Sequence, residues 1–248
     1  MTVIKSPQEV AIMRQAGRIV AIALQRLKEE IKPGIKTSHL DSVAASELQK
    51  YGAKGSFKGY RGFPAYLCVS VNDEIVHGIP GERRLNEGDI VSLDFGAVVD
   101  GFHGDGAITV GVGEINTKAQ ELLAVTEAAL MVGIGTARNG VRLGDVSAAI
   151  QDYVETRGFS VVKEYSGHGV GRDLHEDPLV PNFGSPGEGP VLRKGMTLAV
   201  EPMVTVGDWR TRLAKNKWTV HTADGSLAAH FEHTIAISED EAEILTLL

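Results

Sequence analysis

Acidic residues interrupt several apolar runs of this chain, and a carboxylate in such a position is chemically informative. Asp94 lies inside the apolar run 90–99, while Glu201 and Glu232 border further apolar runs. Burying a carboxylate costs several kcal/mol of folding free energy unless a cation or strong hydrogen bonds compensate its charge. Taken singly, each acid is better explained by the solvent-exposed face of an antiparallel strand. Three of them in one chain favour a shared cation site.

A fourth acid, Asp105, is joined to Asp94 by a predicted hairpin. The pair Asp100-Gly101 is a strong two-residue turn signal, and with this turn the numbers of facing residues add up to 201. Gly96 then pairs with Asp105, so Asp94 and Asp105 are diagonal neighbours on one face, roughly 7–8 Å apart at the backbone. Two carboxylates at this spacing repel each other unless a cation lies between them.

His168 adds a nitrogen donor to these four acids. Gly167 and Gly169 flank it and allow the backbone to approach closely. Alone, it would be read as a loop histidine without a role. Four carboxylates and one imidazole carry a charge of −4, which two divalent cations neutralise, and an oxygen-rich site with one nitrogen suits manganese, iron, cobalt or zinc. The sequence therefore predicts an acidic two-metal site.

Two amphipathic helices are expected near the start of the chain. Ser6 is placed to cap the first helix, Pro7 suits its first turn, and Glu9 completes a capping box. Apolar residues then recur every three or four positions, and the proline–glycine pair at 33–34 ends the helix. A second amphipathic helix follows and ends at Gly52.

The same pattern recurs later in the chain. A capping box at 117–120 predicts a third helix, and a fourth helix ends at Gly158. Gly34 matches Gly140, and Gly52 matches Gly158, at a common offset of 106 residues. Any two amphipathic helices with glycine stops look alike, so both an ancient duplication and coincidence stay open.

Helices followed by β-rich runs, twice over, indicate an α+β fold with a central, largely antiparallel sheet. No linker or low-complexity segment divides the chain. We therefore expect one domain over residues 1–248, with an internal pseudo-repeat of about 1–110 and 111–248. The expected strands lie at 67–71, 90–99, 102–110, 196–206 and 229–237.

The composition excludes several classes of protein. Of the 248 residues, 43% are hydrophobic and 23% charged, as in ordinary soluble proteins. No run approaches the ~18 apolar residues of a membrane span, and charged residues within 1–30 argue against a signal-peptide core. The single cysteine, Cys68, fits a reducing compartment, so we expect a cytoplasmic protein. The net charge of −7 argues against nucleic acid as the main ligand.

At the same residues the chain resembles the type I methionine aminopeptidases of the pita-bread metallopeptidase family. The segment 165–175 (YSGHGVGRDLH) looks like that family's signature, and the segment 68–80 (CVSVNDEIVHGIP) also matches. Asp94, Asp105, the triplet 201–203 (EPM) and the segment 231–234 (FEHT) complete the family's five-ligand pattern in order and spacing. The resemblance covers essentially the whole chain.

This resemblance implies the pita-bread fold, with two pseudo-symmetric halves around a curved sheet. It also implies removal of the initiator methionine from nascent proteins and peptides when the second residue is small. Asp94 would hold one of two divalent metal ions, His168 and Glu201 the other, while Asp105 and Glu232 would bridge both. The partners would be polypeptide N-termini, with a transient ribosome contact left open and no membrane. The protein would be a monomer.

The resemblance assigns further residues to the substrate. His77 and His175 would contact the bound peptide without being ligands, and His175 would stabilise the oxyanion that develops on the carbonyl. Glu201 would accept a proton from the attacking water and pass it to the leaving amine. An apolar pocket for methionine would consist of Tyr60, Phe63, Cys68 and Trp218. Without the resemblance, these four would be read as core or surface residues and His77 as a turn residue.

Two departures from the family pattern bear on substrate preference. Gly106-Ala107 follow Asp105 where many relatives have a hydroxyl residue, and Leu174 and Phe63 replace other aromatic residues beside the pocket. One alternative function is a proline-specific peptidase of the same fold, since residues 175–178 (HEDP) resemble its motif. Those enzymes usually carry a further N-terminal domain. The other alternative, a non-catalytic binding module, would be expected to have lost metal ligands.

Overall fold

Helix boundaries follow the capping residues closely in the computed structural model, which describes residues 2–248. The Ser6 hydroxyl accepts from Glu9 N–H and the Glu9 carboxylate accepts from Ser6 N–H, as predicted. The third helix differs from the prediction, because Asn116 rather than Thr117 is its cap and accepts from Ala119 N–H. The helices are α1 (Pro7–Glu30), α2 (Thr37–Tyr51), α3 (Thr117–Thr136), α4 (Leu143–Glu155) and the short 3-10 helix η1 (Tyr60–Gly62).

Within residues 2–248 the strands form one nine-stranded sheet and two three-stranded sheets, and the strand pairs in them are antiparallel. The large sheet has the order β1-β4-β5-β14-β9-β7-β8, with β2 beside β4 and β15 beside β14. The bounds are β1 (Lys54–Gly55), β2 (Leu67–Val71), β3 (Glu74–Val76), β4 (Ile90–Val99), β5 (Phe102–Gly111), β6 (Ser160–Val161), β7 (Ser166–Gly169), β8 (Glu176–Pro181), β9 (Thr197–Val200), β10 (Met203–Thr205), β11 (Thr211–Leu213), β12 (Val220–Thr222), β13 (Ala228–His230), β14 (Glu232–Ala236) and β15 (Glu243–Ile244).

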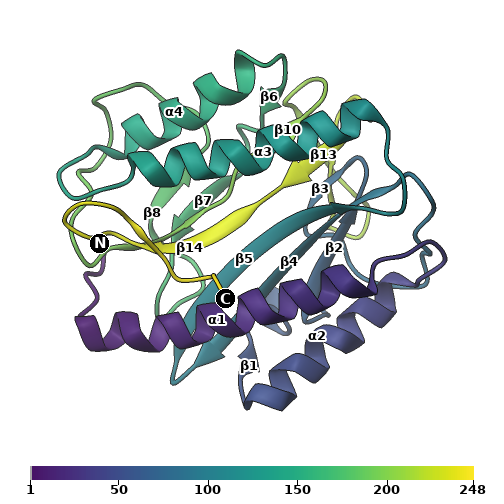
Figure 1. Ribbon diagram of the computed structural model, residues 1–248, viewed down its shortest axis with the longest axis horizontal. Helices are drawn as coiled ribbons and strands as arrows, with labels where there is room; N and C mark the ends of the chain where they lie inside the picture. The colour runs from purple at the N-terminus through teal and green to yellow at the C-terminus, as the bar shows by residue number, and fades with distance from the viewer. Residues whose placement is uncertain (1) are drawn as a thin grey trace.

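All four α-helices of residues 2–248 cover the same face of the large sheet (Figure 1). α1 lies over β4 and β5 with α2 beside it, and α3 lies over the strands of the other half with α4 beside it (Figure 1). Each helix pair covers its own apolar cluster. Val91, Leu93 and Phe95 of β4 belong to the cluster under α1, so the alternate residue Asp94 faces the opposite side of the sheet. The helices thus leave one sheet face free for the site.

The two long strands predicted at 196–206 and 229–237 are each divided into two. Glu201 and Pro202 interrupt the first between β9 and β10, and Phe231 interrupts the second between β13 and β14. Proline has no N–H to donate to a ladder, which explains the first break. On one side of the breaks β9 pairs with β14 in the large sheet, and on the other β10 pairs with β13 in a separate sheet. The breaks place Glu201 at a junction between sheets.

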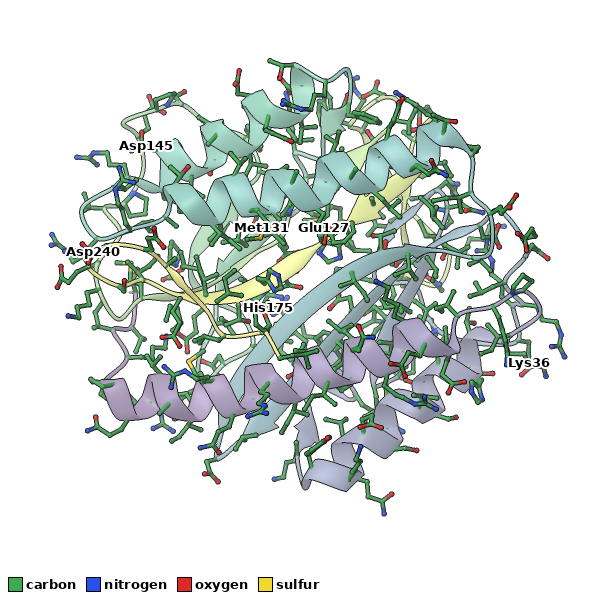
Figure 2. The ribbon with its side chains drawn as sticks, in the orientation of Figure 1. Lys36, Glu127, Met131, Asp145, His175 and Asp240 are labelled. Carbon is green, nitrogen blue, oxygen red and sulfur yellow. The ribbon has the colours of Figure 1, made fainter. Side chains whose placement is uncertain are left out.

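Figure 2 labels the charged residues Lys36, Asp145 and Asp240 at the rim of the molecule. His175, by contrast, is seen near the middle of that view, among the strands. None of the described helices is long and apolar enough to cross a membrane.

Candidate active site

A row of paired residues crosses four strands on the sheet face that is turned away from the helices. Cys68 on β2 pairs with Asp94 on β4. Asp94 pairs in turn with Ala107 on β5, and Ala107 pairs with Glu232 on β14. Asp105 lies two residues before Ala107 and opposite Gly96, which is the hairpin register predicted from the sequence. Strand pairing therefore brings three of the four acids together.

Asp105 is held at both ends of its backbone by one hydroxyl group. The Thr234 hydroxyl accepts from Asp105 N–H at 2.9 Å and donates to the Asp105 carbonyl at 2.8 Å. Gly106 N–H donates to the Asp105 side chain at 3.1 Å. Gly106, where a hydroxyl residue was noted as missing, therefore still supplies a polar contact to the acid through its backbone.

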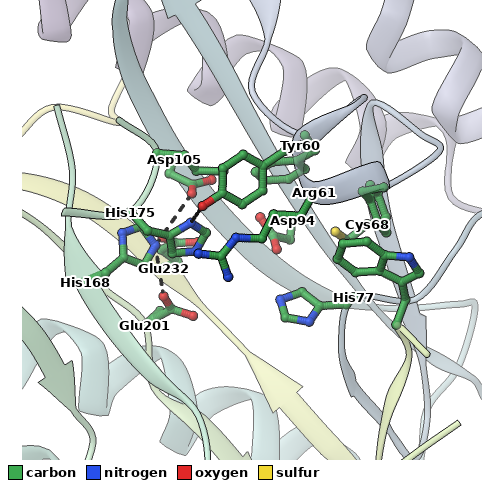
Figure 3. A pocket seen from close by; sticks show the side chains of 14 residues that line it. Tyr60, Arg61, Cys68, His77, Asp94, Asp105, His168, His175, Glu201 and Glu232 are labelled. Atoms are coloured by element: carbon green, nitrogen blue, oxygen red, sulfur yellow. Dashed lines mark hydrogen bonds and ion pairs between the residues drawn. The ribbon is translucent and has the colours of Figure 1, made fainter. Parts of the chain in front are cut away.

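The remaining candidates come from β7 and the end of β9. His168 pairs with Ala199, and Ala199 pairs with Thr234. The register of β9 and β14 ends at Val200 and His233, and continuing it by one residue sets Glu201 opposite Glu232. Figure 3 shows the side chains of His168, Glu201, Asp105 and Glu232 converging.

The His168 ring points a bare nitrogen at two of the acids. Its Nδ1 lies 2.9 Å from the Gly169 carbonyl, which can only accept, so Nδ1 carries the ring proton. Its Nε2 lies 3.4 Å from Glu201 Oε1 and 3.9 Å from Asp105 Oδ2. A histidine ligand of a metal is normally oriented by such a hydrogen bond from its other nitrogen.

Burial shifts the pKa values of the whole cluster in the directions that favour the neutral forms of its side chains. Desolvation, followed by repulsion from the neighbouring carboxylates, raises the pKa values of Asp94, Asp105 and Glu232 well above their ordinary range. Desolvation raises the pKa of Glu201 to about 8 and lowers the pKa of His168 to about 3. Three buried acids and the partly exposed Glu201, all with raised pKa values, lie beside an imidazole that stays neutral, and a divalent cation would stabilise this site.

Unpaired oxygen atoms support the same conclusion. Asp94 Oδ1 and Glu232 Oε1 are buried without a hydrogen-bond partner among the described residues. Ligand atoms of Asp105, His168 and Glu232 lie within 4.8 Å of one another. Carboxylate oxygens with one imidazole are a donor set suited to divalent transition metals. The residues present therefore fit a metal centre.

One buried residue beside this cluster was not predicted. His230 is 1% exposed, and its ring nitrogen lies with carboxylate oxygens of Glu201 and Glu232 within 4.8 Å of one another. The alternation His230-Phe231-Glu232 is the signal that could have found it, since residues two apart on a strand share a face. Phe231 belongs to the apolar cluster under α3.

The predicted pocket residues surround a cavity of about 150 Å³ that opens beside the acids. Phe63 and Trp218 meet edge to face, with ring centroids 5.1 Å apart. Leu174, which was noted as a departure, belongs with Phe63 and Cys68 to one buried apolar cluster, and Tyr60 and Trp218 pack against it. Burial raises the pKa of the Cys68 thiol well above its ordinary value, so Cys68 is a neutral wall and no nucleophile.

The two flanking histidines line the same cavity. His175 Nδ1 lies 2.8 Å from the Tyr60 hydroxyl, and its ring centroid lies 4.2 Å from that of His168. His77 has a φ of 60°, which is rare outside glycine and points to a functional constraint. Desolvation lowers the pKa values of both rings to about 4, so each is neutral near pH 7. Arg61, a further lining residue that was not predicted, projects into the cavity in Figure 3.

Comparisons with known proteins point in one direction. The family model described as metallopeptidase family M24 matches residues 11–239. The chain is 54% identical over 246 residues to methionine aminopeptidase 1 of Bacillus subtilis, covering 99% of both chains. It is 51% identical over 248 residues to the methionine aminopeptidase of Clostridium perfringens, covering 100% of both.

Solved structures separate two groups of similar proteins. The methionine aminopeptidase of Thermotoga maritima has a TM-score of 0.99 and 50% identity, with 100% of both chains covered. The Xaa-Pro dipeptidase from Bacillus anthracis has a TM-score of 0.79 and 25% identity, and the match covers 99% of this chain but only 62% of that one. The pita-bread fold is common to both groups, and they differ in the share of the other chain that the match covers.

Proposed function

We propose that this chain, which belongs to metallopeptidase family M24, is a metal-dependent methionyl aminopeptidase. It removes the initiator methionine from proteins and peptides whose second residue is small. The observation that carries this proposal is that four acids and one imidazole line the same cavity as a set of apolar side chains. The apolar part of this cavity is sized for one side chain. The full-length relatives at 50% identity or more are methionine aminopeptidases, which supports the same activity.

The metal centre in this proposal holds two divalent cations, drawn from cobalt, manganese, iron and zinc. Asp94 would serve one cation, His168 and Glu201 would serve the other, and Asp105 and Glu232 would serve both. When bound, the cations would supply Lewis acidity, which lowers the pKa of water so that hydroxide is available near neutral pH to attack a peptide carbonyl.

The protein residues divide the remaining tasks. Glu201 takes up the proton released in the attack and delivers it to the leaving amine, since its carboxylate reaches both the cluster and the cavity. The Tyr60 hydroxyl lies 2.8 Å from His175 Nδ1. With the hydroxyl as donor in this proposal, the ring proton is on Nε2, where it stabilises the developing oxyanion. His77 contacts the peptide from the other side of the cavity, beside Trp218.

The apolar cavity selects the side chain. Phe63, Cys68 and Trp218 offer aromatic and sulfur surfaces to an unbranched thioether, a combination that gives favourable sulfur–aromatic contacts. The free α-amine of the substrate would bind one cation of the metal centre at the inner end of the cavity, which would restrict cleavage to the first residue. Because its substrates are nascent chains, the proposed enzyme acts in the cytoplasm. The proposal includes a transient contact with the ribosome.

Mass spectrometry of four peptides tests the proposal against its rival. We expect rapid release of methionine from Met-Ala-Ser, slow release from Met-Leu-Ser, and no cleavage of Ala-Pro-Ser or of N-acetylated Met-Ala-Ser. Cleavage of Ala-Pro-Ser with Met-Ala-Ser left intact would assign the chain to the proline-specific peptidases. No cleavage of any peptide, with metal content confirmed, would favour the non-catalytic binding module.

A further inference from the structure

His230 is a buried imidazole whose backbone is fixed on both sides. The Thr109 hydroxyl accepts from His230 N–H at 2.9 Å and donates to the His230 carbonyl at 2.8 Å. Ser92 lies 2.8 Å from the same hydroxyl and completes its hydrogen bonding. The pairing of Met203 with His230 brings this residue to the junction where Glu201 lies. The position of the ring is therefore set by the sheets on both sides.

The Glu201 carboxylate lies between two imidazoles. His168 Nε2 is 3.4 Å from its Oε1, and His230 Nε2 is 3.3 Å from its Oε2. Neither ring nitrogen of His230 makes a well-aligned hydrogen bond within residues 2–248. Because the last torsion of a glutamate side chain is soft, a small rotation of the carboxylate brings Oε2 into line with Nε2.

The proton on the His230 ring decides what the residue can do. A neutral imidazole carries one N–H and one bare nitrogen. A proton on Nδ1 would be buried without an acceptor, whereas a proton on Nε2 faces a carboxylate oxygen at 3.3 Å. The proton therefore belongs on Nε2, and His230 is a donor. His168 is the reverse case, because the Gly169 carbonyl takes its Nδ1 proton and leaves Nε2 free for a cation.

We propose that His230 is a positioning residue that donates from Nε2 to Glu201 Oε2 and so presents Oε1, beside His168, to the metal centre. The inference rests on the proposed function, because it assigns Glu201 to that centre. His230 itself is not a ligand. Its loss frees the carboxylate to rotate, which weakens cation binding and misplaces the group that carries the proton.

Three variants separate a donor from a ligand and from a core residue. His230→Gln keeps an N–H donor at similar reach, His230→Leu removes it at similar volume, and His233→Leu removes a half-buried imidazole from β14, the next strand along the chain. His233 is held by Thr246 instead of Glu201, which makes it the matched control. Each full-length protein is titrated with Co²⁺ by calorimetry, and X-ray absorption of the loaded protein counts coordinated imidazoles. Thermal unfolding of the metal-free proteins reports folding.

We expect one imidazole on the metal centre in the parent and in all three variants. His230→Leu should bind Co²⁺ about 10- to 100-fold more weakly, the size found when the partner of a ligand is lost. Its turnover on Met-Ala-Ser should fall by a larger factor than its KM changes. His230→Gln should restore the Co²⁺ affinity and the turnover to within about threefold of the parent.

Two coordinated imidazoles in the parent and one in His230→Gln would overturn the inference and make His230 a ligand. Co²⁺ affinity unchanged in His230→Leu, or lowered equally in His233→Leu, would also overturn it, without touching the proposed function. A parent protein that binds no Co²⁺ would reject both together.

Discussion

Two imidazoles in the site stand side by side but touch different groups. His168 directs Nε2 at Glu201 and Asp105, whereas His175 is held through Nδ1 by Tyr60. Proximity alone would make both of them ligands, since their ring centroids are 4.2 Å apart. Their hydrogen bonds assign one to the cation and the other to the substrate.

Substitution should therefore separate the two roles. His168→Ala should lose metal and activity together, because it removes a donor atom from the centre. His175→Ala should keep near-normal metal content and lose about 10²–10³ in turnover, the size expected for one oxyanion donor. Calorimetric metal titration paired with turnover on a Met-Ala peptide measures both effects.

The control for this pair is His39→Ala, an exposed histidine near Glu30 on the surface. It should leave metal affinity and turnover unchanged. Loss of metal from His175→Ala as severe as that from His168→Ala would contradict the division of roles.

At the level of single residues, what the sequence could predict depended on how local the signal was. Asp94 and Asp105 were placed together because a two-residue turn fixes the register of a hairpin, and that register is confirmed. His230 was missed because it lies near Glu201 only as a result of the strand breaks at Glu201 and Phe231, which the sequence did not predict. Arg61 was missed because no sequence pattern marks a single cation in a 3-10 helix as short as η1.

At the level of elements, α1 can cover β5 only because two glycines meet there. A Cβ added to Gly104 would lie 2.6 Å from Gly17 N, and one added to Gly17 would lie 2.3 Å from the Leu245 carbonyl oxygen. Backbone atoms cannot move aside as the tip of a side chain can. These contacts fix the distance between the helix and the strand that carries Asp105.

Gly104→Ala should therefore destabilise the protein, by about 1–3 kcal/mol or more, as expected for an overpacked core. Gly81→Ala is the matched control, because a Cβ there meets nothing within 4 Å, and its effect should stay within about 0.5 kcal/mol. Urea unfolding of both variants, in metal-free and metal-loaded forms, measures the difference. Equal stability of the two variants would show that the helix shifts freely on the sheet.

The helices were better predicted than the strands, for a physical reason. Capping residues act within one turn, so the start of α1 was found correctly, while Asn116 was overlooked beside Thr117. The strand breaks depend on which sheet each half joins, which is a long-range choice. The predicted duplication stays a proposal, and it is favoured by Gly34 and Gly140, whose φ values are 86° and 87°.

At the level of the whole molecule, the sheet encloses negative charge that the two halves contribute jointly. Asp94 and Asp105 come from one half, and Glu201 and Glu232 from the other. Repulsion within this cluster opposes the docking of the halves, and a cation offsets it. Metal binding is therefore linked to folding, and removal of the metal should lower the melting temperature.

The size of this metal-dependent gain in stability should grow with pH. A carboxyl group whose folded pKa is raised stabilises the folded state below its unfolded pKa and loses that contribution as the pH rises through the folded value. For Glu201 the ordinary pKa is 4.5 and the folded pKa is about 8, so the loss begins near pH 4.5 and its last part falls between pH 7 and pH 8.5. The buried histidines have lowered pKa values, and their contribution is largely constant above an unfolded pKa of about 6.5. In the metal-free protein Glu201 alone should then cost about 1 kcal/mol over that window.

Calorimetric melting of the chelated and Mn²⁺-saturated proteins, under nitrogen at pH 7 and pH 8.5, tests this linkage. The gap between their melting temperatures should widen by about 2–4 °C per kcal/mol for a chain of this length. Glu201→Gln removes the titrating group, so its metal-free form should show a flatter dependence on pH than the parent does. A gap that narrows as the pH rises would mean that the acids are already ionised and paired without metal, and the buried negative charge would then have another partner.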